Sequence, residues 1–100
     1  MQVQIQSIHF TADEKLTQHI QKRVEKLETF YPRIQRIEVF LKLENESSSV
    51  RDKVVEMRVH VPGNDLYAAD TSKSFEASTD EVVEQLRRQL VKHKEKLSAK

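Results

Sequence analysis

The fold is decided by the stretch FEASTDEVVEQLRRQLVKHKEKL, residues 75–97, near the end of the 100-residue chain. Its apolar side chains recur every three or four residues, which is the spacing of one face of an α-helix. The members of this stripe are Phe75, Thr79, Val82, Val83, Leu86, Leu90 and Leu97, and His93 shares it. Ser74 is a suitable N-cap. The stretch therefore predicts a long helix with one buried face.

The C-terminal half of this helix is unusually basic. It carries five cations in ten residues, opposed only by Glu95, and these cations are Arg87, Arg88, Lys92, Lys94 and Lys96. Arg88, Lys92 and Lys96 are four residues apart and form one row. A helix C-terminus favours cations by about 0.3–1 kcal/mol each, which would explain two or three of them. Five cations are more than a helix end requires, so this pattern favours a binding surface over a solvated helix end.

Alternating apolar residues upstream predict four strands. They are expected at residues 2–6, 35–44, 53–61 and 66–71. The polar segment 45–49 would form a hairpin loop, and residues 62–65 would form a turn because proline and glycine suit one. Ile8 and Phe10 continue the first strand in the opposite parity, so a bulge or bend is expected near Ser7.

A first helix is expected over residues 12–29. Thr11, followed three residues later by Glu14, has the form of a capping box. The buried stripe would be Leu16, Ile20, Val24 and Leu27. Lys22 and Lys26 lie on one flank, and Arg23 lies at the edge of the stripe. Lys22 and Lys26 alone fit the exposed half of an ordinary amphipathic helix, but they would extend the basic surface if the two helices lie side by side.

The predicted order of elements is β-α-β-β-β-α, which indicates an α+β fold. Two helices packed on one face of a four-stranded, mostly antiparallel sheet would bury all of these stripes and leave the other sheet face polar. One hundred residues suffice for a single domain, residues 1–100. No apolar run approaches the roughly 20 residues of a membrane span, and the first residues do not form a secretory signal. A cytoplasmic protein without a membrane partner is expected.

The residue types needed for catalysis or metal binding are scarce. The chain has no cysteine, and one glycine, Gly63, which excludes a glycine-rich phosphate loop. None of the four histidines has a paired metal-ligand spacing, although His9 and His60 could approach each other across the sheet. His93 is expected to be a half-buried packing residue. The serines at 47–49 lack an orienting base. The sequence therefore predicts no enzyme, no metal site and no cofactor.

Binding to a polyanion is the chemistry that remains. The aromatic residues are poorly placed to stack on bases, because Phe75 belongs to the apolar stripe and only Phe40 and Tyr67 could reach the open sheet face. Contact with phosphates and groove shape is therefore expected, rather than reading of bases. The candidate residues are Lys22, Arg23, Lys26, Arg87, Arg88, Lys92, Lys94 and Lys96.

Two segments resemble a known family of ribosome-binding proteins. Residues 86–96, LRRQLVKHKEK, resemble the R-Q-L-x-K-x-K helix of the ribosome hibernation-promoting and ribosome-associated translation inhibitor family. Residues 22–28, KRVEKLE, resemble the end of that family's first helix, where K-L-E precedes an aromatic pair. The resemblance covers essentially the whole chain, strand order included, and is to the short form of the family.

The resemblance implies a fold like that of double-stranded RNA-binding domains and a place in the small ribosomal subunit. There the protein would occupy the channel of messenger RNA and of A- and P-site transfer RNA, compete with both, and keep the 70S ribosome idle under stress or in stationary phase. The family's basic residues, which contact 16S rRNA, match Arg23, Lys26, Arg88, Lys92 and Lys96. The chain departs from the family at Gln85, often a lysine, and at residues 74–76. A monomer off the ribosome is expected.

Two other interpretations stay open. A generic double-stranded RNA-binding module would share the strand order and the basic second helix. A protein-interaction module could instead modulate a transcription factor through that helix. Competition with messenger and transfer RNA on small subunits would distinguish a ribosome-binding factor from the first alternative. Binding to a purified transcription factor without RNA would support the second.

Overall fold

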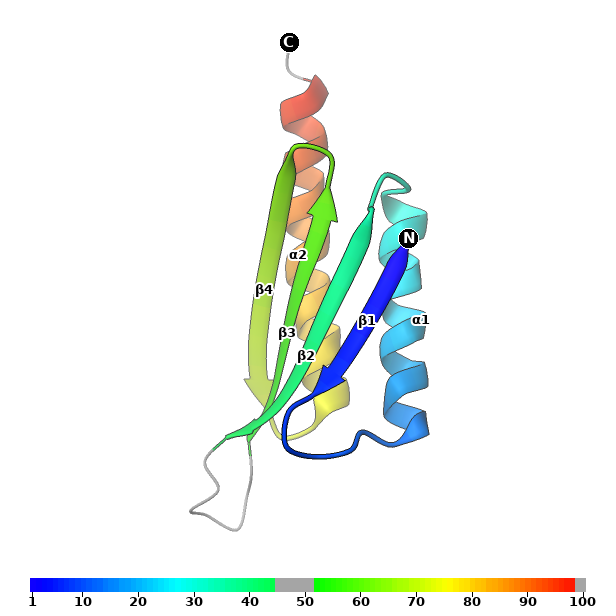
Figure 1. Cartoon of the computed structure of the whole chain (residues 1–100). Helices are drawn as coiled ribbons and strands as arrows, with labels where there is room; N and C mark the ends of the chain where they lie inside the picture. The colour runs from blue at the N-terminus through cyan, green and yellow to red at the C-terminus, as the bar shows by residue number, and fades with distance from the viewer. Residues whose placement is uncertain (45–51, 99–100) are drawn as a thin grey trace.

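The computed structural model describes residues 1–44 and 52–98, which form a sheet and two helices in the predicted order β-α-β-β-β-α (Figure 1). The elements are β1 (Gln2–Ser7), α1 (Glu14–Phe30), β2 (Arg36–Glu44), β3 (Asp52–Val61), β4 (Asn64–Ser72) and α2 (Phe75–Ser98). The hairpin loop predicted at residues 45–49 lies outside the described residues.

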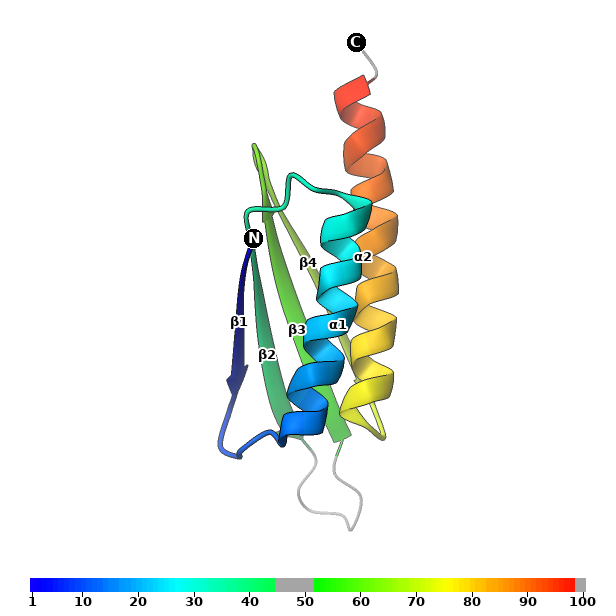
Figure 2. The ribbon, with the colours of Figure 1, turned by 90° about the vertical axis from the view of Figure 1, so that its right-hand side faces the viewer.

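The strands lie in the order β1-β2-β3-β4, and the sheet is mostly antiparallel as predicted. β1 runs parallel to β2, with Val3 opposite Ile37, whereas β2 with β3 and β3 with β4 are antiparallel. A parallel pair needs a crossover connection, which α1 supplies. Both helices lie side by side and cover the same face of the sheet (Figure 2). This arrangement confirms the predicted α+β architecture.

The core lies between the two helices and the sheet, and it is built from the predicted apolar positions. Its fully buried side chains include Ile20, Val24, Ile37, Val39, Leu41, Val55, Met57, Val59, Val82, Leu86 and Leu90. Burial of each aliphatic side chain of this size contributes about 1.5–3 kcal/mol. The helices are therefore held chiefly by their apolar stripes and less by intrinsic propensity.

The buried stripe of α2 ends earlier than predicted. Leu90 is fully buried, but Leu97 is 47% exposed. The reason is visible in Figure 1, where the last turns of α2 project past the turn between β3 and β4. The prediction that Leu97 belongs to the buried face is therefore wrong, because helical spacing does not reveal where the sheet beneath a helix ends.

The start of α2 is confirmed, whereas the start of α1 differs. Ser74 Oγ accepts a hydrogen bond from Ala77 N–H at 3.1 Å, as expected for an N-cap. For α1 the N-cap is Asp13, whose Oδ1 accepts from Leu16 N–H at 2.8 Å. The predicted capping box at Thr11 is therefore wrong. Asp13 also places a negative charge at the positive end of the helix dipole, which favours it as the cap.

The chain bends after β1, and this confirms the bend predicted near Ser7. β1 keeps one-to-one register with β2 through Ser7, so no bulge interrupts the pairing. The bend follows at residues 8–10, where His9 has a positive φ of 65°. Histidine is one of the few residues other than glycine that adopts this conformation with some frequency.

The turn between β3 and β4 is tighter than predicted. Val61 pairs with Asn64, so only Pro62 and Gly63 remain as the turn, and Gly63 has a φ of 80° that other residues rarely adopt. Residues 64 and 65, predicted to lie in the turn, are the first residues of β4. This correction matters for function, because it places Asn64 on the sheet, beneath the basic half of α2.

Two polar residues inside α2 are fully buried and do not interrupt the helix, and one of them is hydrogen-bonded. Ser78 Oγ donates a hydrogen bond to Lys53 O at 2.7 Å and lies 2.8 Å from Ser72 Oγ. Ser78 and Thr79 are both fully buried. The Ser78 hydroxyl thus fixes the first turns of α2 against β3 and the end of β4.

Candidate nucleic-acid interface

The basic residues of α2 divide between its exposed side and the flank that faces α1. Arg88, Lys92 and Lys96 form the row that their spacing predicted, hereafter the cationic row, and all three are exposed. Arg87 and Lys94 lie on the other flank, over the Phe30 ring at the end of α1. One basic helix therefore presents two separate groups of cations.

The cationic row is only weakly neutralised. The nearest carboxylate to Arg88 is Glu81, at 3.9 Å between Nη2 and Oε1, and both side chains are at least half exposed. An exposed pair of this kind contributes about 0–1 kcal/mol. Lys92 and Lys96 make no ion pair within residues 1–44 and 52–98. Their charge is therefore available to an anionic partner.

A second group of cations, the interhelix cluster, lies around a groove of about 210 Å³ between α1 and α2. It comprises Arg23, Lys26 and Arg87, which line the groove, and Lys94 beside them. Arg87 Cζ lies 5.3 Å and Lys94 Nζ 4.6 Å from the centroid of the Phe30 ring. Both distances fit cation–π interactions, so Phe30 holds two cations of α2 beside Lys26.

Arg23 also joins the two helices. Its Nε lies 3.1 Å from Asp80 Oδ1, and the same oxygen lies 3.0 Å from His19 Nε2. Asp80 thus partly neutralises Arg23. Sequence reasoning missed both Asp80 and Phe30. The signal for Asp80 was its position two turns before Arg87, on the same helix flank, whereas the placement of Phe30 depends on how the helices cross.

Lys22 is the one candidate that the structure does not bring into either group. It is exposed on α1 and lines neither the interhelix groove nor the hollow beside α2. The expectation that the helices lie side by side is confirmed, and Lys26 is the α1 lysine that reaches the cations of α2.

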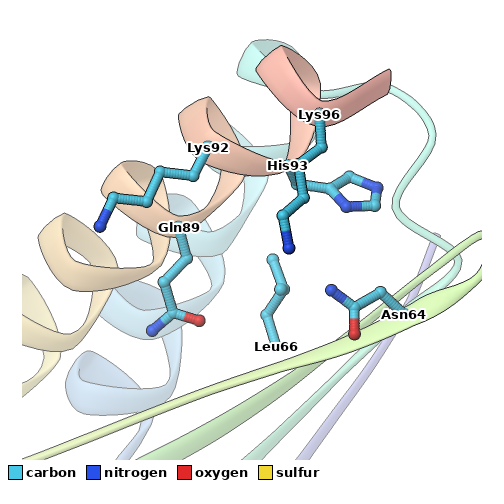
Figure 3. Close-up of a pocket in the computed structure, with 6 residues that line it drawn as sticks. All are labelled: Asn64, Leu66, Gln89, Lys92, His93 and Lys96. Atoms are coloured by element: carbon cyan, nitrogen blue, oxygen red, sulfur yellow. The ribbon is translucent and has the colours of Figure 1, made fainter. Parts of the chain in front are cut away.

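Lys92 and Lys96 border a hollow of about 220 Å³ between α2 and the start of β4 (Figure 3). Its remaining lining residues are Asn64, Leu66, Gln89 and His93. Gln89 Nε2 donates a hydrogen bond to Tyr67 O at 2.8 Å, which ties α2 to β4. His93 is 8% exposed and meets the Tyr31 ring edge-on, with 5.7 Å between centroids. His93 therefore packs, as predicted, but more deeply than half-buried.

Most of the charged side chains on the open face of the sheet lie beside a partner. Lys42 Nζ lies 2.9 Å from Glu56 Oε1, and His60 lies 2.6 Å from Glu38 and 2.8 Å from Asp65. The hydrogen bond to Glu56 raises the pKa of Lys42, and the one from His60 lowers the pKa of Glu38. Tyr67 is exposed on this face, but it stands among paired charges. Arg58 is also exposed on this face and makes no ion pair within residues 1–44 and 52–98, but the face still offers a polyanion less free positive charge than the cationic row does.

His9 and His60 do not approach each other across the sheet, a possibility that the sequence had left open. His60 is paired with Arg36, which lies opposite Gln2 at the start of β1. His9 follows the other end of β1, so the length of the strand separates the two rings. Within the described residues, no group of three or more His, Cys, Asp or Glu side chains is arranged to hold a metal ion. No helix there is long and apolar enough to cross a membrane.

Removal of the Glu38 charge is expected to flatten the acid dependence of stability. Because folding lowers the pKa of Glu38 below 4.5, its charge stabilises the fold above that pH, and this contribution is lost as the pH falls further. Urea midpoints measured from pH 7 to pH 3 should therefore fall less in Glu38→Gln than in the unmodified protein. Glu44→Gln, the same change at the exposed end of β2, is the control. Identical acid dependence in the Glu38 variant and the unmodified protein would contradict the His60 contact.

Comparisons with known sequences single out one family. Residues 3–98 match the family model described as sigma 54 modulation protein / S30EA ribosomal protein. The chain is 30% identical over 97 residues to the ribosome hibernation promoting factor of Escherichia coli K12, covering 97% of both chains. It is 28% identical over 96 residues to the protein of the same name from Pseudomonas putida KT2440, covering 96% of this chain and 89% of that one.

Two solved structures share the fold. A ribosomal subunit interface protein from Coxiella burnetii superposes with a TM-score of 0.83 at 20% identity, covering 94% of this chain and 98% of that one. The N-terminal domain of Thermus thermophilus Protein Y gives 0.71 at 18% identity, covering 88% and 90%. At these identities the two structures establish the architecture.

Proposed function

Because this chain belongs to the sigma 54 modulation protein / S30EA ribosomal protein family, we propose that it is a ribosome hibernation factor that binds the ribosome and inhibits translation. The observation that carries the proposal is the cationic row, which is exposed on a helix anchored in the core. Cations held on a rigid element are what binding to a phosphate backbone requires. The proposed role is non-enzymatic and cytoplasmic.

We place the contact in the small ribosomal subunit, on 16S rRNA, in the channel of messenger RNA and of A- and P-site transfer RNA. The resemblance of residues 86–96 to the family's second helix supports this location. A protein in that channel would exclude messenger and transfer RNA, block initiation and preserve idle ribosomes under stress or in stationary phase. A single domain acting as a monomer would suffice.

The two helices together would form the rRNA-binding surface. The cationic row would make the main phosphate contacts, and the interhelix cluster would extend them across the groove toward α1. Lys22 would contribute from the outer flank of α1. The sheet's open face would point away from the RNA, because most of its charged side chains already lie beside a partner.

Cosedimentation with purified small subunits across a salt series tests this function. Binding should fall as salt rises, because phosphate contacts release counterions. Binding should also be lost when messenger RNA and initiator transfer RNA are bound beforehand, because the same channel would then be occupied.

Two outcomes would contradict the proposal in different ways. Binding that falls with salt but ignores the prebound ligands would indicate a generic double-stranded RNA-binding module. Failure to bind at any salt concentration would favour a protein-interaction module that modulates a transcription factor.

A further inference from the structure

We propose that the hollow between α2 and the start of β4 is a binding site for a single phosphate group (Figure 3). Where that phosphate belongs to an RNA backbone, the inference rests on the proposed function and deepens it. The site would join the cationic row, through Lys92 and Lys96, to a residue of the sheet, Asn64. The argument depends on three side-chain donor groups, those of Asn64, His93 and Lys96, that make no hydrogen bond or ion pair within the described residues.

Asn64 presents a hydrogen-bond donor to the hollow. Its Oδ1 accepts from Asp65 N–H at 2.9 Å, and this contact fixes which way the amide is turned. Nδ2 is then directed toward the side of the hollow where Lys96 Nζ lies (Figure 3). An amide nitrogen and an ammonium group are both donors only, so neither can satisfy the other. An acceptor bound in the hollow could accept hydrogen bonds from both donors.

His93 adds a third donor. The side chain is more than nine-tenths buried, and its Nε2 is buried without a hydrogen-bond partner among residues 1–44 and 52–98. We assign the ring proton to Nδ1, because this tautomer leaves an acceptor and not an N–H group unpaired in the core. Figure 3 shows the ring beside the Lys96 side chain, with this second nitrogen on the side of Asn64. Nδ1–H is then available to the same acceptor.

The charge of the hollow suits an anion. None of its six lining residues is a carboxylate. Asp65, the neighbour of Asn64, alternates to the opposite face of the sheet and contacts His60 there at 2.8 Å. Lys92 stands at the rim and directs its amine away from Lys96 (Figure 3). Lys96 therefore supplies the nearest full positive charge, and Lys92 the next.

The size and remaining polarity of the hollow fit the phosphate of a nucleic acid. Its volume of about 220 Å³ far exceeds the roughly 10–15 Å³ that one water molecule requires by the same measure. Gln89 Nε2 is engaged with Tyr67 O, so Gln89 Oε1 is left as an acceptor at the edge. Such an acceptor suits a sugar hydroxyl next to the phosphate, as the 2′-hydroxyl of RNA provides.

Asn64→Asp tests the site, because it keeps an acceptor for Asp65 N–H but replaces the Nδ2 donor with an anionic oxygen. Affinity for purified small subunits is expected to fall about tenfold or more, since hydrogen bonds to charged groups are strong. Gln6→Glu makes the same change of charge on exposed β1, at the other edge of the sheet, and should change affinity less than about twofold. Far-UV circular dichroism and urea midpoints would show that both variants are folded.

A titration of the isolated protein with inorganic phosphate separates the sources of the ligand. At constant ionic strength, the Asn64 side-chain amide and the His93 ring resonances should shift, and in Asn64→Asp the His93 shift should be smaller. If Asn64→Asp loses affinity for small subunits, whether or not these resonances shift, the phosphate that the site binds belongs to RNA. If the resonances shift but Asn64→Asp keeps its affinity for small subunits, the ligand of the site is a free phosphate compound.

The two proposals can fail separately. Equal subunit binding by Asn64→Asp and the unmodified protein, together with unmoved resonances, overturns the phosphate site and leaves the ribosome proposal standing. If the unmodified protein does not bind subunits but phosphate still shifts the two resonances, the ribosome proposal is overturned and the phosphate site is retained. Unmoved resonances in a protein that also fails to bind subunits overturn both.

Discussion

Leu86→Ala is expected to lower the free energy of unfolding by about 2–5 kcal/mol. Leu86 is fully buried in the middle of α2 and belongs to the core between the helices and the sheet. The substitution removes apolar surface from the core and leaves a cavity that the surrounding side chains fill only in part. Small domains are stable by about 5–15 kcal/mol in total, so the loss is a large fraction. Urea denaturation followed by circular dichroism measures it.

Leu97→Ala is the matched control for this experiment. It makes the same substitution in the same helix, but at a side chain that is 47% exposed. Its effect should stay within about 0.5 kcal/mol, as for most surface substitutions. Similar losses in the two variants would show that α2 is buried along its whole length, contrary to the structure.

Reversing two charges of the cationic row is expected to weaken small-subunit binding about a hundredfold or more. Charge-assisted hydrogen bonds contribute about 1.5–3 kcal/mol each, and Arg88→Glu with Lys92→Glu removes two cations. The reversed charges would also repel the phosphates. The slope of log affinity against log salt should decrease by about 2, because two fewer phosphates are neutralised. Cosedimentation across a salt series measures both effects.

The fold should survive this double substitution. Arg88 and Lys92 are both exposed, and the nearest carboxylate to Arg88 is only loosely paired at 3.9 Å. New like-charge neighbours along the helix cost about 0.2–0.5 kcal/mol per pair. The urea midpoint should therefore change little, which separates a binding defect from unfolding.

Lys15→Glu with Lys73→Glu is the control for net charge. Both lysines are exposed, and they lie at or just before the N-terminal ends of α1 and α2, away from the cationic row. This double variant should retain most of its affinity. If both double variants lose affinity equally, binding follows overall charge, and the assignment of the row as the contact surface is wrong.

Much of the fold could be predicted, because the side-chain period of helices and strands is a local property of the backbone. The buried positions Val39, Met57 and Leu86 were found from spacing alone. The cap of α1 was not, because Thr11 and Asp13 are both suitable caps by residue type. The choice between them depends on the path of the chain after the bend at residues 8–10. Residue type alone does not predict that path.

The candidate site could be predicted only in part. The cationic row followed from its spacing, and its exposure agrees with that prediction. The residues around it did not follow, because they come from other elements. Phe30 lies beneath Arg87, Asp80 lies against Arg23, and Asn64 lines the same hollow as Lys96, so each placement joins segments that are far apart in sequence.

By itself, then, the sequence determined the order of the elements, the apolar face of each and the presence of a basic helix. These features depend on side-chain spacing within a few turns, which backbone geometry sets. Only the tertiary structure decided where α2 leaves the sheet, so that Leu97 is exposed. It also decided which cations pack against α1 and which, within the described part of the chain, stay unpaired beside β4. The physical reason is that these outcomes depend on where the helices cross each other and the sheet, and packing of the whole core sets those crossings.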